Sequence, residues 1–391
     1  MITKPTSPAA LTWSGVTARR MARHALTEPA TRLSPAGVAG VLCGAHAQVL
    51  SAAELSIGRR IAGAVRSDVQ RALWQERTLV KTFGPRGTIH LLATADLPVW
   101  TGALSALPSP APAHPDGVRF TPGQAEEVIA AIGGALADAE LTVEELTEAI
   151  ADRAGPWAIE RTMEAFGGKW PRWRQLTSTA AHRGMLCFGP DRGRKVTYTN
   201  PRRWLPGFRP ADGDAALRAL LTRYLYAYGP ATPQHFAKWL GIPPRYAAGL
   251  FAGLAAELEP VALDGEPGWA LAGDTATPAR PHRGVRLLPY FDAYLVAGQP
   301  RERLYPGAAA TRALTPAGQA GNYPVLLVDG VAGGVWHQRR SGRKLAITVE
   351  PLRELTASQR RQLDDEADLV GAVMEATPTL TVGTVTVGAH A

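Results

Sequence analysis

The feature that most limits how this 391-residue chain can fold is a unit of helices followed by a β-hairpin, which recurs three times. The first copy covers residues 14–92. Ser34 and Pro35 fit the N-cap and first position of a helix, and Gly44 is a typical C-terminal stop. The strand-like runs TLVKTFG and TIHLLA then flank a turn tripeptide at residues 85–87. This copy therefore predicts helices closed by a hairpin.

Two further helices are expected between Gly44 and this hairpin. Ser51 and Glu54 have the spacing of a capping box, which opens a helix. A short helix is predicted at Val69–Trp74. Several helices followed by a hairpin are the plan of a winged-helix module.

The second copy follows the proline-rich stretch LPSPAPAHPDG at residues 107–117, which we interpret as a linker or surface loop. Thr142 and Glu145 form a capping box, and a second helix is expected over residues 169–183. The runs MLCFGP and KVTYT then flank the basic turn at residues 191–194, which predicts a second wing.

The third copy begins near Asp214 with ALRALLTRYLYAYG. Thr232 and Pro233 cap the run QHFAKWLG, and a further helix is expected to end near Leu258. The run PVALDGEPGWALA, with its Asp-Gly turn, predicts the third hairpin.

From Val285 onward the chain is rich in predicted strands, with the runs VRLLPYFDAYLV and YPVLLVDG and a hairpin that turns at Ser341 and Gly342. A final amphipathic helix is predicted from Ala357 to Met374. The hairpin tip carries four cations, which indicate a phosphate or groove contact or, alternatively, a solvated hairpin end: Arg339, Arg340, Arg343 and Lys344.

These patterns predict an α+β fold of three tandem winged-helix modules and a β-rich C-terminal element. The three modules are predicted at residues 1–105, 119–210 and 211–280. A linker at residues 106–118 follows the first module, and the C-terminal element covers residues 281–391.

The charge of the chain favours a polyanionic partner. The formal net charge is +8, and of the 42 basic residues six are lysines and the other 36 arginines. Arginine forms bidentate contacts with phosphate. Codon bias in a GC-rich genome also favours arginine, but it does not explain the sign of the charge. Because no apolar amphipathic arm accompanies the basic surplus, we expect nucleic acid rather than a membrane as the partner.

The sequence contains no motif for a metal or a cofactor. Cys43 and Cys187 form no Cys-x-x-Cys pair, and neither GxGxxG nor GxxxxGK[ST] occurs. No segment approaches the ~20 apolar residues of a membrane span, and the first residues lack the apolar core of a signal peptide. We therefore expect a cytoplasmic monomer without cofactor or metal.

The connector AHAQVL at residues 45–50 holds the strongest candidate for chemistry. If the connector is extended, His46 and Gln48 lie on the same side and their side chains converge. A neutral imidazole accepts a proton from water, and an amide holds that water by accepting and donating hydrogen bonds. The pair fits hydrolysis, although a histidine in a helix connector is also a common structural residue.

The runs LTWSGVTARRMARHAL, GAHAQVLSAAELSIGRR and LVKTFGPRGTIHLL resemble the winged-helix DNA glycosylase family typified by AlkZ. The resemblance continues through LLPYFDAYLVAGQPR and YPVLLVDGVAGGVW, so it covers most of the chain. It implies three winged-helix units and a β-rich element in a C-shaped protein that binds double-stranded DNA. It also implies excision of N7-alkylated purines and, in some members, unhooking of interstrand crosslinks made by antibiotics.

The catalytic motif of that family is Gln-x-Gln, or Gln-x-Asp in a second branch. The matching residues here are His46-Ala47-Gln48, so the first position departs from the family pattern and the second keeps it. This departure leaves a chemically competent pair and puts the substrate range in doubt.

Other polar residues are candidates for contact with DNA or substrate. Thr88 and His90 share one face of the first wing strand, and the resemblance implies that both face the cleft. Asp292 follows an apolar run and is either a strand-end cap or a ligand to substrate or water. The candidate phosphate contacts in the first two wing turns are Arg86, Arg192 and Arg194.

We therefore predict a monofunctional glycosylase that removes N7-alkylated purines, with bulky antibiotic-derived adducts or crosslinks as substrates and self-resistance as the biological role. The motif contains no lysine that would form a Schiff base. Two alternatives stay open: a non-catalytic winged-helix transcriptional regulator, and a DNA-damage binder that has lost turnover.

Overall fold

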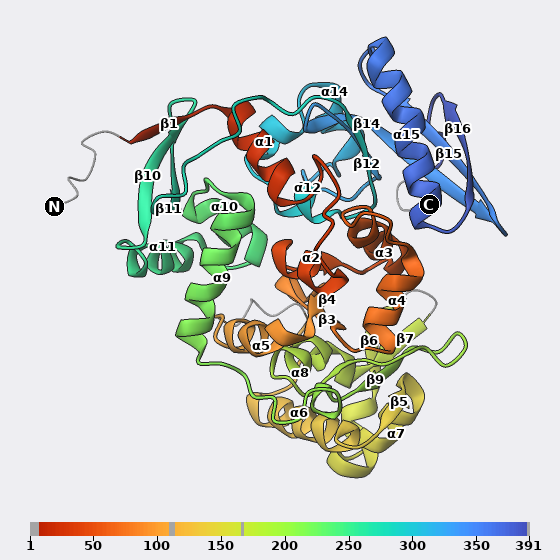
Figure 1. The fold of residues 1–391 in the computed structure, drawn as a ribbon. Helices are drawn as coiled ribbons and strands as arrows, with labels where there is room; N and C mark the ends of the chain where they lie inside the picture. Colours follow the sequence, from red (N-terminus) through yellow and green to blue (C-terminus); the bar gives the residue numbers. More distant parts are fainter. Residues whose placement is uncertain (1–7, 109–113, 166–167, 389–391) are drawn as a thin grey trace. The chain divides into compact units, whose positions relative to one another are not determined.

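The computed structural model describes residues 8–108, 114–165 and 168–388 (Figure 1). The chain forms two compact units, and each is described by itself. The first unit combines the residues up to Ala72 with those from Leu221 onward, and the second unit is Leu73–Leu220. Two helices, α4 (Arg66–Trp74) and α9 (Gly213–Tyr228), include the points at which the chain passes from one unit to the other.

The first unit contains most of the helices and two sheets. Its helices are α1 (Trp13–Arg23), α2 (Pro35–Val41), α3 (Leu50–Gly58), α10 (Pro233–Leu240), α11 (Pro244–Gly253), α12 (Ala293–Ala297), α13 (Arg301–Leu304), α14 (Ala308–Ala313) and α15 (Ala357–Val373). Its strands are β1 (Ala9–Leu11), β2 (Ala45–His46), β10 (Leu258–Leu263), β11 (Glu266–Leu271), β12 (Val285–Leu288), β13 (Val325–Val328), β14 (Val331–Ser341), β15 (Lys344–Pro351) and β16 (Thr377–Val382).

The larger sheet of the first unit has the strand order β12-β13-β14-β15-β16, in which only β15 and β16 are parallel neighbours. Figure 1 shows β15 and β16 beside α15, in blue. Successive residues of a strand face opposite sides of a sheet. Trp336 accordingly packs in the cluster that contains Leu363 and Val370 of α15, whereas Val335 packs in another cluster with Tyr294 of α12. The sheet is therefore covered on both faces.

The smaller sheet of the first unit is the hairpin β10-β11 with β1 added in parallel to β10. The hairpin turns at Asp264 and Gly265, both with positive φ, as the Asp-Gly pair predicts. Helix α10 begins after Thr232, whose side chain accepts a hydrogen bond from the His235 backbone N–H, so the predicted cap is confirmed.

The second unit contains helices α5 (Leu97–Ser105), α6 (Pro122–Leu136), α7 (Val143–Ala154) and α8 (Thr177–His182). Its strands are β3 (Leu79–Phe83), β4 (Ile89–Ala93), β5 (Glu140–Thr142), β6 (Arg161–Ala165), β7 (Gly168–Pro171), β8 (Cys187–Phe188) and β9 (Thr197–Thr199). The core packs around Trp173, whose indole N–H donates to Thr147 Oγ1 on α7. The predicted hairpins β3-β4 and β8-β9 and the Thr142 capping box of α7 are confirmed.

Three sequence predictions of helices are wrong in their bounds. The helix expected over residues 169–183 begins only at Thr177, because Pro171 lacks an N–H and disfavours a helical residue before it, and the chain forms β7 there instead. Ser51 does not cap α3, which begins one residue earlier, and Glu54 instead accepts a hydrogen bond from Gln70. The third of these helices, α11, ends at Gly253 rather than near residue 258.

The predicted strand run VRLLPYFDAYLV is also corrected. Only Val285–Leu288 is a strand, because Pro289 interrupts it and Phe291 turns the chain with a positive φ. Asp292 then starts α12. The predicted C-terminal helix and the last hairpin are confirmed, but the hairpin turns one residue later than predicted, at Gly342 and Arg343, because Ser341 still pairs with Lys344.

The predicted modules and the two compact units are different divisions of the chain, since the boundary at residue 72 falls inside the first predicted module. The modular division therefore stays a prediction. Part of the predicted linker at residues 106–118, namely residues 109–113, lies outside the described residues. None of the helices in the described ranges is both long and apolar enough to span a membrane.

Candidate functional site

The connector between α2 and α3 places His46 and Gln48. Helix α2 ends at Val41, and both Cys43 and Gly44 have positive φ values, of 53° and 94°, so the chain turns sharply before β2. The predicted extended conformation holds for Ala45 and His46, but the strand ends there and Gln48 lies in a bend, so the expected alternation does not reach the amide. His46 is only 9% exposed, whereas Gln48 is exposed. The His46 side chain is therefore buried beneath the connector, and Gln48 lies at the surface.

The ring of Phe291 stacks on the His46 imidazole. The two ring centroids are 5.6 Å apart and the planes are inclined by 27°. Phe291 has a φ of 55°, a conformation that is rare for a bulky side chain. A residue 245 positions along the chain thus contacts the motif directly.

Asp292, the next residue, is a structural anchor. Its carboxylate accepts hydrogen bonds from Arg60 at 2.8 and 2.9 Å and from the Ser56 hydroxyl at 2.8 Å. It also accepts from the Tyr294 backbone N–H and so caps the helix α12 rather than the end of a strand, since β12 ends at Leu288. Burial by itself raises the pKa of Asp292, but the charge of Arg60 and the hydrogen bonds from Arg60 and Ser56 outweigh it and hold the pKa below its ordinary value.

A pocket of about 170 Å³ lies between the residues that follow the motif and those that precede Phe291. Its lining residues are Val49, Ser51, Ala52, Pro289, Tyr290, Pro324, Trp336, His337 and Gln338. The Trp336 indole N–H donates to Leu288 O at 2.8 Å, which fixes this wall. Burial lowers the pKa of His337, which disfavours the charged imidazolium in this pocket.

Sequence reasoning missed the aromatic and polar residues of this pocket and of the stack. The run LLPYFD gives no chemical signal beyond its aspartate, because aromatic residues after a strand are usual in a core. Only the fold brings Tyr290 and Phe291 to the connector.

The predicted residues of the first wing lie in the second unit and engage their own hairpin. The Thr88 hydroxyl donates to Pro85 O at 2.9 Å, and His90 Nδ1 lies 2.9 Å from Thr88 O. His90 is buried, and burial lowers its pKa to about 4. Arg86 is exposed in the turn. Contact of these residues with substrate or DNA stays a prediction.

The predicted phosphate contacts differ in how free their side chains are. Arg340 donates to Met374 O at 2.7 Å and to Gly342 O at 3.0 Å, so it closes the C-terminal end of α15. Arg192 pairs with Glu145. The remaining side chains are exposed and have no hydrogen bond or ion pair with any described residue: Arg194, Arg339, Arg343 and Lys344.

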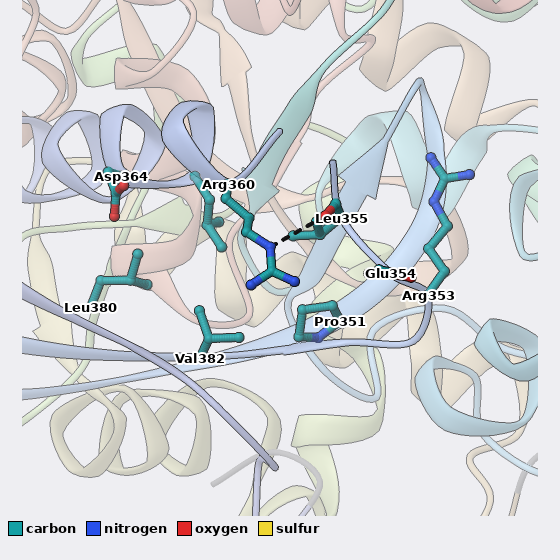
Figure 2. A pocket seen from close by; sticks show the side chains of 9 residues that line it. Pro351, Arg353, Glu354, Leu355, Arg360, Asp364, Leu380 and Val382 are labelled. Atoms are coloured by element: carbon teal, nitrogen blue, oxygen red, sulfur yellow. Dashed lines mark hydrogen bonds between the residues drawn. The ribbon is translucent and has the colours of Figure 1, made fainter. Parts of the chain in front are cut away.

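A second pocket, of about 200 Å³, contains none of the predicted site residues (Figure 2). It lies between α15 and the ends of β15 and β16, where Leu355, Leu363 and Leu380 supply an apolar lining. Arg360 Nε donates to Leu355 O at 3.3 Å across it, as Figure 2 shows.

Comparison with known proteins identifies the class of protein. The profile of the DNA glycosylase AlkZ-like family matches residues 39–373. The chain is 33% identical to the interstrand DNA cross-link repair glycosylase of Streptomyces sahachiroi, over 83% of this chain and 87% of that protein. The structure of Streptomyces sahachiroi DNA glycosylase AlkZ matches with a TM-score of 0.80 and 28% identity, over 96% of this chain and all of that one.

The fold and the sequence thus define a DNA glycosylase of DNA repair. The chain belongs to the AlkZ-like DNA glycosylase family. The resemblance seen in the sequence and the predicted mixture of helices and strands are confirmed. The matched range includes the connector with His46 and Gln48.

We predict that the buried Arg60–Asp292 pair stabilises the first unit strongly. Asp292→Ala leaves the Arg60 charge buried without its partner, and breaking such a pair costs about 3–5 kcal/mol in the free energy of unfolding. Urea unfolding followed by tryptophan fluorescence measures the loss. Arg353→Gln is the control, because it breaks the more exposed pair with Asp329 and costs less than about 1 kcal/mol. Equal losses in the two variants would contradict the anchoring role.

Proposed function

We propose that this protein hydrolyses the N-glycosidic bond of purines alkylated at N7, with His46 and Gln48 handling the attacking water. One observation carries the proposal: in a chain of the DNA glycosylase family, a buried, stacked imidazole and an exposed amide stand two residues apart in the connector that holds the family motif.

The chemistry requires little from the enzyme at the leaving group. Alkylation at N7 gives the purine a positive charge, so the base departs without strong protonation. The enzyme has to position water and stabilise an oxocarbenium-like sugar. His46 accepts the proton of the water, and Gln48 orients the water by accepting and donating hydrogen bonds.

We propose monofunctional chemistry, which the residues of the connector support. Residues 45–50 include no lysine, so the connector offers no amine for a Schiff base with the sugar. The product is therefore a free purine and an intact abasic site.

We propose bulky N7-guanine adducts or interstrand crosslinks, of the kind that DNA-alkylating antibiotics make, as the biological substrates. The support is the Streptomyces sahachiroi relative, which is named as an interstrand DNA cross-link repair glycosylase. The composition, rich in arginine, glycine and proline, is consistent with a GC-rich, antibiotic-producing host, in which such an enzyme gives self-resistance.

The direct test uses duplex DNA with one N7-methylguanine and a second duplex with a large intercalating N7-guanine adduct. Released base and abasic sites are measured under single-turnover conditions, and expression in a sensitive host tests protection against the alkylating compound. We expect release of both bases and protection. If neither base is released and the protein binds one promoter sequence tightly, it is a transcriptional regulator; tight binding to the adduct without release identifies a damage binder.

We predict that His46→Ala and Gln48→Ala each slow single-turnover excision by about 10²-fold or more, because each removes one of the two groups that handle the water. The two effects are not additive, since both groups act on the same water. DNA affinity, measured by fluorescence anisotropy, stays near that of the wild type.

Two further variants control this prediction. His46→Gln restores the commoner family motif and retains activity if orientation of the water matters more than proton abstraction. His282→Ala removes a histidine outside the connector and leaves the rate unchanged. Full activity of His46→Ala would assign that residue to structure alone.

We predict that the hairpin between β14 and β15 binds phosphates through its free cations. The triple replacement of Arg339, Arg343 and Lys344 by Ala weakens DNA binding and lowers the slope of log affinity against log salt by about 0.9 for each phosphate that the hairpin no longer neutralises. Arg340→Ala is the matched control, since this arginine is engaged with Met374 O and Gly342 O. An unchanged affinity and slope in the triple variant would remove this hairpin from the DNA interface.

A further inference from the structure

Phe291 is held in an unusual conformation beside the motif. A bulky residue with positive φ is strained and persists only where its surroundings fix it. The contacts that fix it come from the next residue: the Asp292 backbone N–H donates to Pro289 O at 3.3 Å, and the Asp292 carboxylate is held by Arg60 and Ser56. The strained turn thus fixes the direction of the Phe291 side chain, which points toward His46.

The loop before β13 also contacts the Phe291 ring. Gly321 has a φ of 105°, and a Cβ added to it would lie 2.3 Å from Cδ1 and Cε1 of Phe291. The ring therefore occupies the space that any other residue at position 321 would fill. The ring is therefore contacted both by the His46 imidazole and by the backbone at Gly321.

A carboxylate commonly orients the imidazole in hydrolases that use histidine. Asp292 is the carboxylate beside Phe291 in the sequence, and its two oxygens are engaged with Arg60, Ser56 and the Tyr294 N–H. The group that this segment presents to His46 is an aromatic ring instead.

We infer that Phe291 is a positioning residue for His46: its ring, backed by Gly321 and fixed by the Arg60–Asp292 pair, sets the plane of the imidazole. This inference rests on the proposed role of His46 in handling water. A ring that stacks on the imidazole face limits the rotation of the imidazole out of its plane before DNA binds. Orientation secured in advance lowers the entropic part of the barrier.

Two glycines of one loop give a matched test. Gly321→Ala pushes the Phe291 ring away from its place, whereas Gly318→Ala, also at a positive φ of 73°, meets no atom within 4 Å. Both variants carry the strain of a left-handed alanine, but only the first disturbs the stack. We expect Gly321→Ala to slow single-turnover excision at least about tenfold, with DNA affinity unchanged, and Gly318→Ala to keep the wild-type rate.

Variants of Phe291 itself distinguish the effect of the aromatic ring from the effect of its volume. Phe291→Tyr keeps the stacked ring, and we expect it to keep the wild-type rate of excision. Phe291→Leu keeps the apolar volume and the strain of a positive φ but lacks the ring, and we expect it to slow excision. In a His46→Ala background Phe291→Leu causes no further loss, because a residue that acts through His46 has nothing left to position. An equal further loss in that background would overturn the inference.

A spectroscopic measurement makes the inference independent of turnover. In protein with ¹³C,¹⁵N-labelled histidine, the ring current of Phe291 displaces the imidazole C–H resonances of His46, which are assigned by their absence in His46→Gln. We expect these resonances to move in Gly321→Ala and Phe291→Leu and to stay in place in Gly318→Ala and Phe291→Tyr.

The outcomes distinguish the two ideas. If His46→Ala is slow but Phe291→Leu moves the His46 resonances and keeps the wild-type rate, the stack is packing and the inference fails while the proposed function stands. If His46→Ala is fully active, the proposed role of His46 fails, whatever the resonances show, and the inference fails with it.

Discussion

The buried ion pair between Arg60 and Asp292 is the interaction on which the candidate site depends. Its two side chains are 1% and 0% exposed, and charges so deeply buried are tolerated only when each is paired and hydrogen-bonded. Arg60 follows α3 and also donates to Ser56 O and His24 O, while Asp292 starts α12. The pair therefore ties the helix after the connector to the strained turn that carries Phe291.

Local signals in the sequence were sufficient to predict helix caps and turns, because these depend on residues that are close together in the chain. Thr142 and Thr232 cap helices, and Asp264 and Gly265 turn a hairpin, all as predicted. Contacts between distant segments left no such signal: β16 adds to β15 in parallel, and Arg60 meets Asp292 across 232 positions. The sequence left Asp292 as either a strand-end cap or a ligand, and both its place at the start of α12 and its ionic partner depend on the fold.

The candidate site was predictable only in part, for a chemical reason. His46 and Gln48 stand out because they are the polar residues of a short, otherwise apolar connector and because they align with the family motif. Phe291 and Gly321 carry no polar group, so their relation to His46 exists only in three dimensions. Thr88 and His90 were chosen by strand alternation, and in the structure both bond to their own hairpin turn.

We propose that this chain recognises an oxocarbenium-like sugar, with the attacking water held by His46 and Gln48, rather than only binding DNA. The most direct measurement compares the affinity for duplex DNA that contains a cationic azaribose, a mimic of that sugar, with the affinity for DNA that contains a neutral tetrahydrofuran. An enzyme that recognises the transition state binds its mimic at least about 10²-fold more tightly. We predict this preference for the wild type and its loss in His46→Ala and Gln48→Ala; equal affinity of the wild-type protein for the two duplexes would contradict the proposed glycosylase chemistry.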